Sequence, residues 1–303
     1  MSTIKIKSMR AIYLQVIMFL IILGTNTANA QLTEYESMYF QNQYINNPAM
    51  AGLNEGVKLN LGYQRQWDQV PGNPILMNGT IEYNAGNRTG WGLNFNSDRA
   101  GLINRTRVVA TYAYHLPIGE EEKLNFGLSA GAKFASIDNS KVIGQYDDIA
   151  LQNFNNGGTF DGDFGMSYTS RLLTIQASLP NLNNFLVNTD DGVKKYVDRS
   201  IFYSAVSYKI LLSNEDEDLN VEPLIAYRGI KGHKDILDAG ARFNFPDYKM
   251  NVSAFYHTNK TVSTAFGIDV IDKVGVFIAY SKYFGSLGAY ANNTFECGLN
   301  FKI

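Results

Sequence analysis

The stretch LNFGLSAGAKF, residues 124–134, alternates apolar residues with polar or small ones over its whole length. One set of alternate positions holds Leu124, Phe126, Leu128, Ala130, Ala132 and Phe134, and the other holds Asn125, Gly127, Ser129, Gly131 and Lys133. Successive side chains of a β-strand point to opposite faces of the sheet. The pattern therefore predicts a strand with one apolar and one polar face.

Comparable runs follow one another between residues 54 and 303, for example at residues 160–169, 237–245 and 262–270. We count about fourteen of them, and no helical period of similar strength accompanies them. Charged residues fall on the polar face of their run, at Asp161, Asp163, Arg242, Asp269, Glu296 and Lys302. Because lipid cannot satisfy a free strand edge, we predict an all-β fold, a closed transmembrane antiparallel β-barrel of about 14 strands with a polar lumen.

The connections between these runs differ in length according to their position in the series. Every second connection is short, at residues 84–87, 117–121, 170–171, 213–218, 246–247 and 271–273. The two longest connections, residues 138–157 and 181–197, both belong to the other set. Outer-membrane barrels have short periplasmic turns and longer extracellular loops. The distribution favours such a barrel, with both chain ends on the periplasmic side.

The first thirty residues have the features of an export signal. An apolar run at residues 11–24 follows three cations and precedes Ala28-Asn29-Ala30, which is a small-residue cleavage site. The run is shorter than the roughly 20 apolar residues of a membrane-spanning helix. We expect cleavage after Ala30, export, and a mature chain that begins at Gln31 and is not a lipoprotein.

Composition excludes several classes of protein. Lys and Arg number 26 against 28 Asp and Glu, without a cationic cluster, which argues against a nucleic-acid partner. Cys297 is the only cysteine, so a disulfide scaffold or a multi-cysteine metal site is excluded. Charged residues make up 18% of the chain, below the roughly 25% of an ordinary soluble domain.

Residues 31–53, QLTEYESMYFQNQYINNPAMAGL, separate the signal from the first strand. They are polar and aromatic, contain no Lys or Arg, and do not alternate cleanly. A barrel of about fourteen strands has room inside it, and the Asn46-Asn47-Pro48 and Ala51-Gly52 pairs are typical of turns. We predict an N-terminal plug segment at 31–53 inside a barrel at 54–303; a disordered leader is the alternative.

The same residues carry a family resemblance. The pattern of Asn42, Asn47, Pro48, Ala49, Ala51 and Gly52 resembles the opening of the PorP/SprF family, although Met50 stands where that family usually has an aromatic residue. Arg65 and Trp67 on the first strand are also similar to the family pattern. The specific motifs lie in the first fifty residues of the mature chain, while length and strand count agree throughout.

The resemblance implies a function that composition and periodicity do not. Proteins of this family belong to the type IX secretion system of Bacteroidota. They are outer-membrane barrels that partner secreted cell-surface proteins, such as gliding adhesins, recognised through a type IX C-terminal domain. Outer-membrane lipid and other secretion-system components are further implied partners. We would place the partner surface on loops 138–157 and 181–197.

The chain ends in Gly298-Leu-Asn-Phe301-Lys-Ile303, a glycine followed by alternating apolar residues. This ending is typical of barrels recognised by the outer-membrane assembly machinery, although Ile303 replaces the usual final aromatic residue. An ordinary last strand would have the same pattern.

The sequence contains few residues that could form a catalytic or metal-binding site. His115 lies on an expected lumen face, His233 in an expected loop, and His257 near Ser253, about 13 Å away along one strand and too far for a hydrogen bond. We therefore predict no catalytic site, no cofactor and no metal site. Acidic pairs at 147–148, 161–163 and 190–191 lack the spacing of a known Ca²⁺ loop.

Three other functions remain open at this point. A plugged channel or transporter for small or hydrophobic molecules would conduct and have no dedicated protein partner. A surface enzyme is disfavoured by the histidine positions. A soluble exported β-protein would be recovered without detergent.

Overall fold

The computed structural model describes residues 37–67, 72–138, 158–183, 200–212, 219–230, 234–285 and 293–303. The expected signal peptide, residues 31–36 of the expected plug segment and most of the two longest loops lie outside these described residues. Within the described part, no helix has the length and apolarity to cross a membrane, a finding that does not bear on strands.

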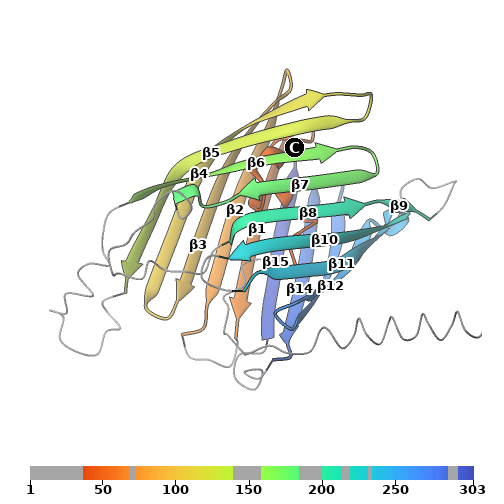
Figure 1. Ribbon diagram of the computed structural model, residues 1–303. Coiled ribbons are helices and arrows are strands. Elements are labelled where there is room, and N and C mark those ends of the chain that lie inside the picture. Colours follow the sequence, from red (N-terminus) through yellow and green to blue (C-terminus); the bar gives the residue numbers. More distant parts are fainter. Residues whose placement is uncertain are drawn as a thin grey trace, which may run out of the picture. The chain divides into compact units, whose positions relative to one another are not determined.

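The strands form one antiparallel sheet (Figure 1). They are β1 (Val57–Gln66), β2 (Ile75–Gly86), β3 (Thr89–Ala100), β4 (Ile103–Pro117), β5 (Lys123–Ile137), β6 (Thr159–Thr169), β7 (Leu173–Leu179), β8 (Ser200–Tyr208), β9 (Ile210–Leu211), β10 (Asn220–Ile230), β11 (Ile236–Phe245), β12 (Met250–His257), β13 (Thr261–Ile271), β14 (Val274–Tyr283) and β15 (Asn293–Lys302).

Neighbours in sequence are neighbours in space, β15 pairs with β1, and β10 pairs with β11, so the sheet closes on itself. The two-residue β9 continues β8 past Lys209 against the same partner, β10. The ring therefore has fourteen strands. The predicted fold class is confirmed.

The two faces of the wall differ as the alternation predicts. On β2, Met77, Ile81 and Tyr83 are exposed and point outward, while Asn78 and Thr80 are buried and point inward. On β5, Leu128 is 57% exposed and Asn125 is fully buried. An apolar outer face is what contact with lipid requires.

The connections at one end are short. The turn between β2 and β3 consists of Asn87 and Arg88, both with positive φ, as in the type I′ turn that joins tightly paired strands. The connections after β4, β6, β11 and β13 are also brief. The connections of residues 138–158 and 180–199 lie at the opposite end, which we take as extracellular.

The C-terminal residues lie at the seam that closes the ring. Phe301 is opposite Leu59 of β1, and the backbone N–H and C=O of Ile303 both bond to Val57 at 2.9 Å. Gly298 is opposite Gly62, and a Cβ added to Gly298 would lie 2.4 Å from the Leu61 oxygen. Recognition of these residues by the assembly machinery stays a prediction.

Candidate functional site

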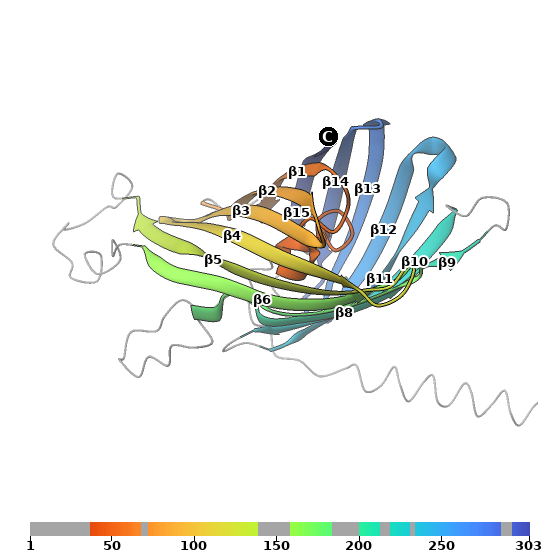
Figure 2. The ribbon, with the colours of Figure 1, turned by 90° about the horizontal axis from the view of Figure 1, so that it is seen from above.

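Residues 37–53, here called the inner segment, lie inside the ring of strands (Figure 2). They form hydrogen bonds to strands around the ring. The inner segment includes two short 3-10 turns, η1 (Gln43–Ile45) and η2 (Pro48–Met50). Many of its side chains are buried: Ser37, Met38, Tyr39, Phe40, Asn42, Tyr44, Asn47, Ala49, Met50 and Ala51. We build the candidate site from these contacts, beginning at the amino-terminal end.

At this end, two hydroxyls bond to buried carboxylates. The Ser37 hydroxyl donates to Glu296 on β15, and the Tyr39 hydroxyl donates to Asp238 on β11. The Tyr39 ring also stacks on Tyr203, with centroids 6.3 Å apart. Burial raises the pKa of Tyr39 well above its usual value, so this phenol stays protonated and remains a donor.

Asp238 is the centre of a buried charged cluster. Arg228 donates to both of its oxygens, at 2.8 and 3.0 Å, and His257 Nδ1 lies 2.5 Å from Oδ1. The carboxylate has no exposed surface, and a buried ion of this kind requires both a counter-charge and hydrogen bonds. Tyr39 therefore binds to an already paired carboxylate.

His257 has a different hydroxyl partner from the one considered in the sequence. Its Nε2 lies 2.8 Å from Ser263 Oγ, which is in turn 2.7 Å from Ser281 Oγ. Pairing of β12 with β13 places Ser263 diagonally across the hairpin from His257. The sequence argument compared His257 only with Ser253 on its own strand, and it therefore did not consider Ser263 on the neighbouring strand.

The Asp238, His257 and Ser263 contacts have the connectivity of a hydrolase triad. However, the His257 and Ser263 side chains have no exposed surface, and Asp238 is also ion-paired with Arg228. A substrate carbonyl has no access to Ser263 in this arrangement. We therefore interpret the cluster as a structural network.

The middle of the inner segment contacts β2 and β4. Asn42 Nδ2 donates to Thr80 at 2.9 Å, and the Tyr44 hydroxyl lies 2.6 Å from Thr111 Oγ1. A Cβ added to Gly92 of β3 would lie 2.6 Å from the Tyr44 ring. The wall is therefore free of a side chain at the point where this ring approaches it.

Asn47 and Pro48 begin η2 and contact β5 and β6, the next strands along the wall after β4. Asn47 Oδ1 accepts from the Ala49 N–H at 3.0 Å, which caps the turn, and Asn47 Nδ2 donates to the Met166 oxygen at 3.1 Å. A Cβ on Gly127 of β5 would lie 2.2 Å from Pro48, and one on Gly165 of β6 would lie 2.1 Å from Asn47. These two glycines allow the turn to approach the strand backbones.

Ala51 and Gly52 end the inner segment near the short turns. The Ala51 oxygen lies 3.1 Å from His115 Nε2. Gly52 has a φ of +64°, its N–H donates to Glu82 at 3.3 Å, and its oxygen accepts from Asn84 at 2.9 Å. A side chain at Gly52 would be strained and would meet the Tyr83 backbone at 2.5 Å.

The structure thus brings together most of the motif residues singled out in the sequence. Asn42, Asn47, Pro48, Ala49, Ala51 and Gly52 all lie against the inner wall. Arg65 does not join them, because it lies on the outward face of β1 with Leu61 and Tyr63. Trp67 follows β1 at the extracellular end, where its backbone N–H donates to the backbone oxygen of Asn293.

Replacing Asn47 by Ala is expected to destabilise the inner segment by about 1–2 kcal/mol, because it removes the cap of η2 and the donor to Met166. Asn46→Ala is the matched control, since Asn46 receives its bond from Ser178 through its backbone oxygen. Chymotrypsin cleavage within the inner segment, in detergent, measures the difference. Equal cleavage rates for the two variants would contradict this role of the Asn47 side chain.

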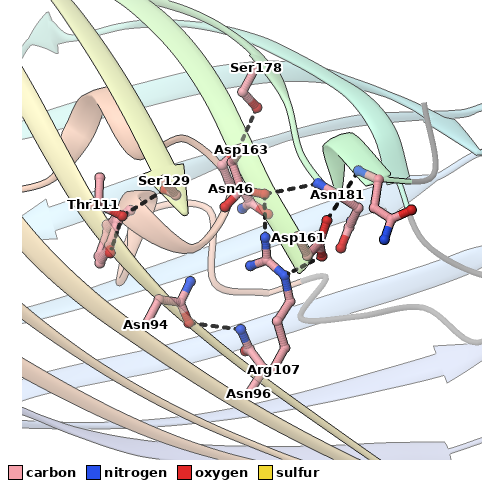
Figure 3. Close-up of polar contacts among 12 residues, drawn as sticks. Asn46, Asn94, Asn96, Arg107, Thr111, Ser129, Asp161, Asp163, Ser178 and Asn181 are labelled. Atoms are coloured by element: carbon pink, nitrogen blue, oxygen red, sulfur yellow. Dashed lines mark hydrogen bonds and ion pairs between the residues drawn. The ribbon is translucent and has the colours of Figure 1, made fainter. Parts of the chain in front are cut away.

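A second polar cluster lies where β7 ends (Figure 3). Arg107 on β4 pairs with Asp161 at 2.8 Å and with Asp163 at 2.7 Å, both on β6. The same carboxylates accept the backbone N–H groups of Asn181 and Asn183, at 2.9 and 3.3 Å. The root of the loop at 181–197 is thereby held against the inner wall.

The carboxylates of this cluster have partners within the protein. The oxygens of Asp161 and Asp163 are bonded to Arg107 and to the loop root. The described ranges contain no group of three or more His, Cys, Asp or Glu that could hold a metal ion. The acidic pairs at 147–148 and 190–191 lie outside the described residues.

A family model described as "Type IX secretion system membrane protein PorP/SprF" matches residues 28–301. The chain belongs to the PorP/SprF family. The resemblance carried by residues 42–67 in the sequence is thus confirmed for nearly the whole chain. No curated protein sequence matches this PorP/SprF protein.

Among solved structures, this PorP/SprF protein is similar to a TodX deletion mutant, a monoaromatic hydrocarbon channel, with TM-score 0.52 and 9% identity over 91% of this chain and 95% of that one. The CymD monoaromatic hydrocarbon channel gives TM-score 0.51 and 12% identity over 86% and 92%. Acinetobacter baumannii Omp33 gives TM-score 0.46 and 8% identity over 83% and 100%. At sequence identities this low, the similarity to the TodX mutant and to CymD supports only the barrel fold and no shared function.

Family and fold together indicate an outer-membrane location for this secretion-system protein. Neither corresponds to a class of enzyme.

Proposed function

We propose that this barrel supports secretion and surface attachment of an exported partner protein recognised through a type IX C-terminal domain. On this proposal the chain is exported by cleavage after Ala30 and performs no catalysis. The extracellular end, with loops 138–157 and 181–197, is the partner surface.

The observation that carries the proposal, beyond family membership, is that the inner segment bonds to many strands. Its hydrogen bonds reach β2, β4, β6, β7, β11 and β15. A segment held at so many points is suited to a scaffold more than to an open channel. A plug role for residues 31–53 is part of this proposal.

The hydrogen bonds at the base of the loop at 181–197 support the proposal. Asn181 has a φ of +55°, and its N–H donates to Asp163. A loop fixed at its base loses less conformational entropy when it binds a partner. We expect the Arg107 cluster to position the loop at 181–197 for the partner without contacting the partner itself.

The experiment is a pull-down of the tagged mature barrel from detergent-solubilised outer membrane of the native cell, with mass spectrometry of the bound proteins. Stoichiometric recovery of one exported protein with a secretion-type C-terminal domain is expected. Deleting residues 184–197 should release that protein, whereas deleting 286–291, in another extracellular connection, should leave recovery unchanged.

The rival is a channel for small or hydrophobic molecules, which the fold similarity to two monoaromatic hydrocarbon channels brings into consideration. A barrel that is recovered alone and conducts in planar bilayers would overturn the secretion proposal. A partner retained after both deletions would place the partner surface elsewhere.

A further inference from the structure

The outward face of the barrel wall carries charge at three positions. In the strands that the structure describes, the charged side chains on this face are Arg65 on β1, Arg99 on β3 and Lys282 on β14, and all three are exposed. Each follows a buried residue that points inward, respectively Gln64, Asp98 and Ser281. The described strands thus present cations to the lipid side and no carboxylate.

These cations occupy equivalent places at the extracellular end of the wall. Strands β1, β3 and β14 all run toward that end, and in each of them the cation is the residue before the last, which is the final outward position. The strands concerned are neighbours around the ring, in the order β14, β15, β1, β2 and β3 (Figure 2). The three cations therefore lie on one side of the barrel and at one end of it.

Strand register places the two arginines at the same level. Ile75 of β2 is opposite Arg65 on one side and opposite Arg99 on the other. Neighbouring strands lie roughly 4.8 Å apart, so the Cα atoms of the two arginines are about 10 Å apart. Lys282 lies on the other side of Arg65, with β15 between them. We call Arg65, Arg99 and Lys282 the outer cation band.

The outer cation band lacks a counter-charge in the part of the chain that the structure describes. None of its three side chains forms an ion pair within these ranges. Asp98, next to Arg99 in the chain, points inward and pairs with Arg105 at 3.2 Å. Lys282 has a ring as its neighbour, since its Nζ lies 5.6 Å from the centroid of Phe284. The band is thus available to an anion from outside the protein.

We propose that the outer cation band binds the phosphate groups of glycolipids in the outer leaflet of the membrane. The argument is charge complementarity. A cation on the lipid face is costly at the middle of the bilayer but tolerated near its surface, where the phosphates of this leaflet lie. Clustered cations at that level bind anionic headgroups, and a guanidinium can donate two parallel hydrogen bonds to one phosphate. This inference does not depend on the identity of the secreted partner.

The test is a titration of the delipidated mature barrel, in detergent, with diphosphorylated lipid A, followed by native mass spectrometry. Arg65→Gln combined with Arg99→Gln should weaken binding about tenfold to thirtyfold, because each cation near an anionic surface contributes roughly fivefold. Lipid A treated with alkaline phosphatase should bind the parent chain as weakly. The matched control combines Arg88→Gln with Lys273→Gln, which removes two exposed cations from the periplasmic turns and should leave binding unchanged.

Equal binding of the phosphorylated and dephosphorylated lipid to the parent chain would overturn the inference, since acyl-chain contact would then account for it. Unchanged binding in the Arg65 and Arg99 variant, or an equal loss in the control, would also overturn it. Each variant is compared with the parent chain in its guanidinium unfolding midpoint, and a double variant that unfolds earlier is replaced by Lys282→Gln, for which a loss of about fivefold is expected. Recovery of the secreted partner in the pull-down is a separate measurement, so either proposal can fail alone.

Discussion

Replacing Asp238 by Ala is expected to lower the free energy of unfolding of the barrel by about 3–5 kcal/mol. The change removes the carboxylate that pairs with the buried Arg228 guanidinium, and it removes hydrogen-bond partners of His257 and Tyr39. An uncompensated buried charge costs far more than the pair contributes, because its desolvation is no longer offset. Guanidinium unfolding in detergent measures the loss.

Asp272→Ala is the matched control for this prediction. Asp272 also pairs with a cation, Lys249, but both side chains are exposed, at 85% and 54%. Exposed pairs contribute about 0–1 kcal/mol, so the unfolding midpoint should hardly change. Similar losses for Asp238→Ala and Asp272→Ala would contradict the importance of burial in this cluster. Asp238→Ala should also increase chymotrypsin cleavage within the inner segment, which Tyr39 no longer anchors.

Replacing Gly127 by Val is expected to displace the inner segment from β5. The first carbon of the new side chain would lie 2.2 Å from Pro48, and its nearest contacts are backbone atoms that cannot rotate away. Overpacking of this kind costs about 1–3 kcal/mol. Because cleavage follows the population of the open form, chymotrypsin should cut the inner segment about ten to a hundred times faster.

Gly79→Val is the control, since Gly79 lies on the outward face of β2 and an added Cβ there meets only Leu61, at 3.5 Å. It should be cleaved at the rate of the parent chain. Conductance in planar bilayers gives a second measurement, because displacement of the inner segment should open the lumen in Gly127→Val alone. Unchanged cleavage and conductance in Gly127→Val would contradict the close packing of η2 on this strand.

The sequence predicted the wall of the barrel well, for a physical reason. A strand between lipid and a polar lumen must alternate, and β5 shows this alternation in residues 124–134 alone. Sequential antiparallel pairing then follows from short turns such as Asn87-Arg88. The interruption of β8 at Lys209 could not be predicted, because it depends on pairing with β10 and leaves no mark in the residue pattern.

The site was less accessible to sequence reasoning. The Asn47-Pro48 turn signal was visible, but its glycine contacts at Gly127 and Gly165 are more than seventy residues away. The role of Asp238 was not anticipated, since it appeared only as one more polar residue between Leu237 and Ala239. The turn at 258–260 was the available signal for His257 and Ser263, because a tight hairpin places the two strands side by side.

Taken by itself, the sequence determined the class of fold, the number of strands to within one and the family, because each is written in local alternation or in a short contiguous motif. Only the tertiary structure decided which charges are paired, which glycines receive the inner segment and in which direction that segment runs. These depend on side chains that strand register brings together from distant parts of the chain, and register around a closed ring is a property of the whole barrel.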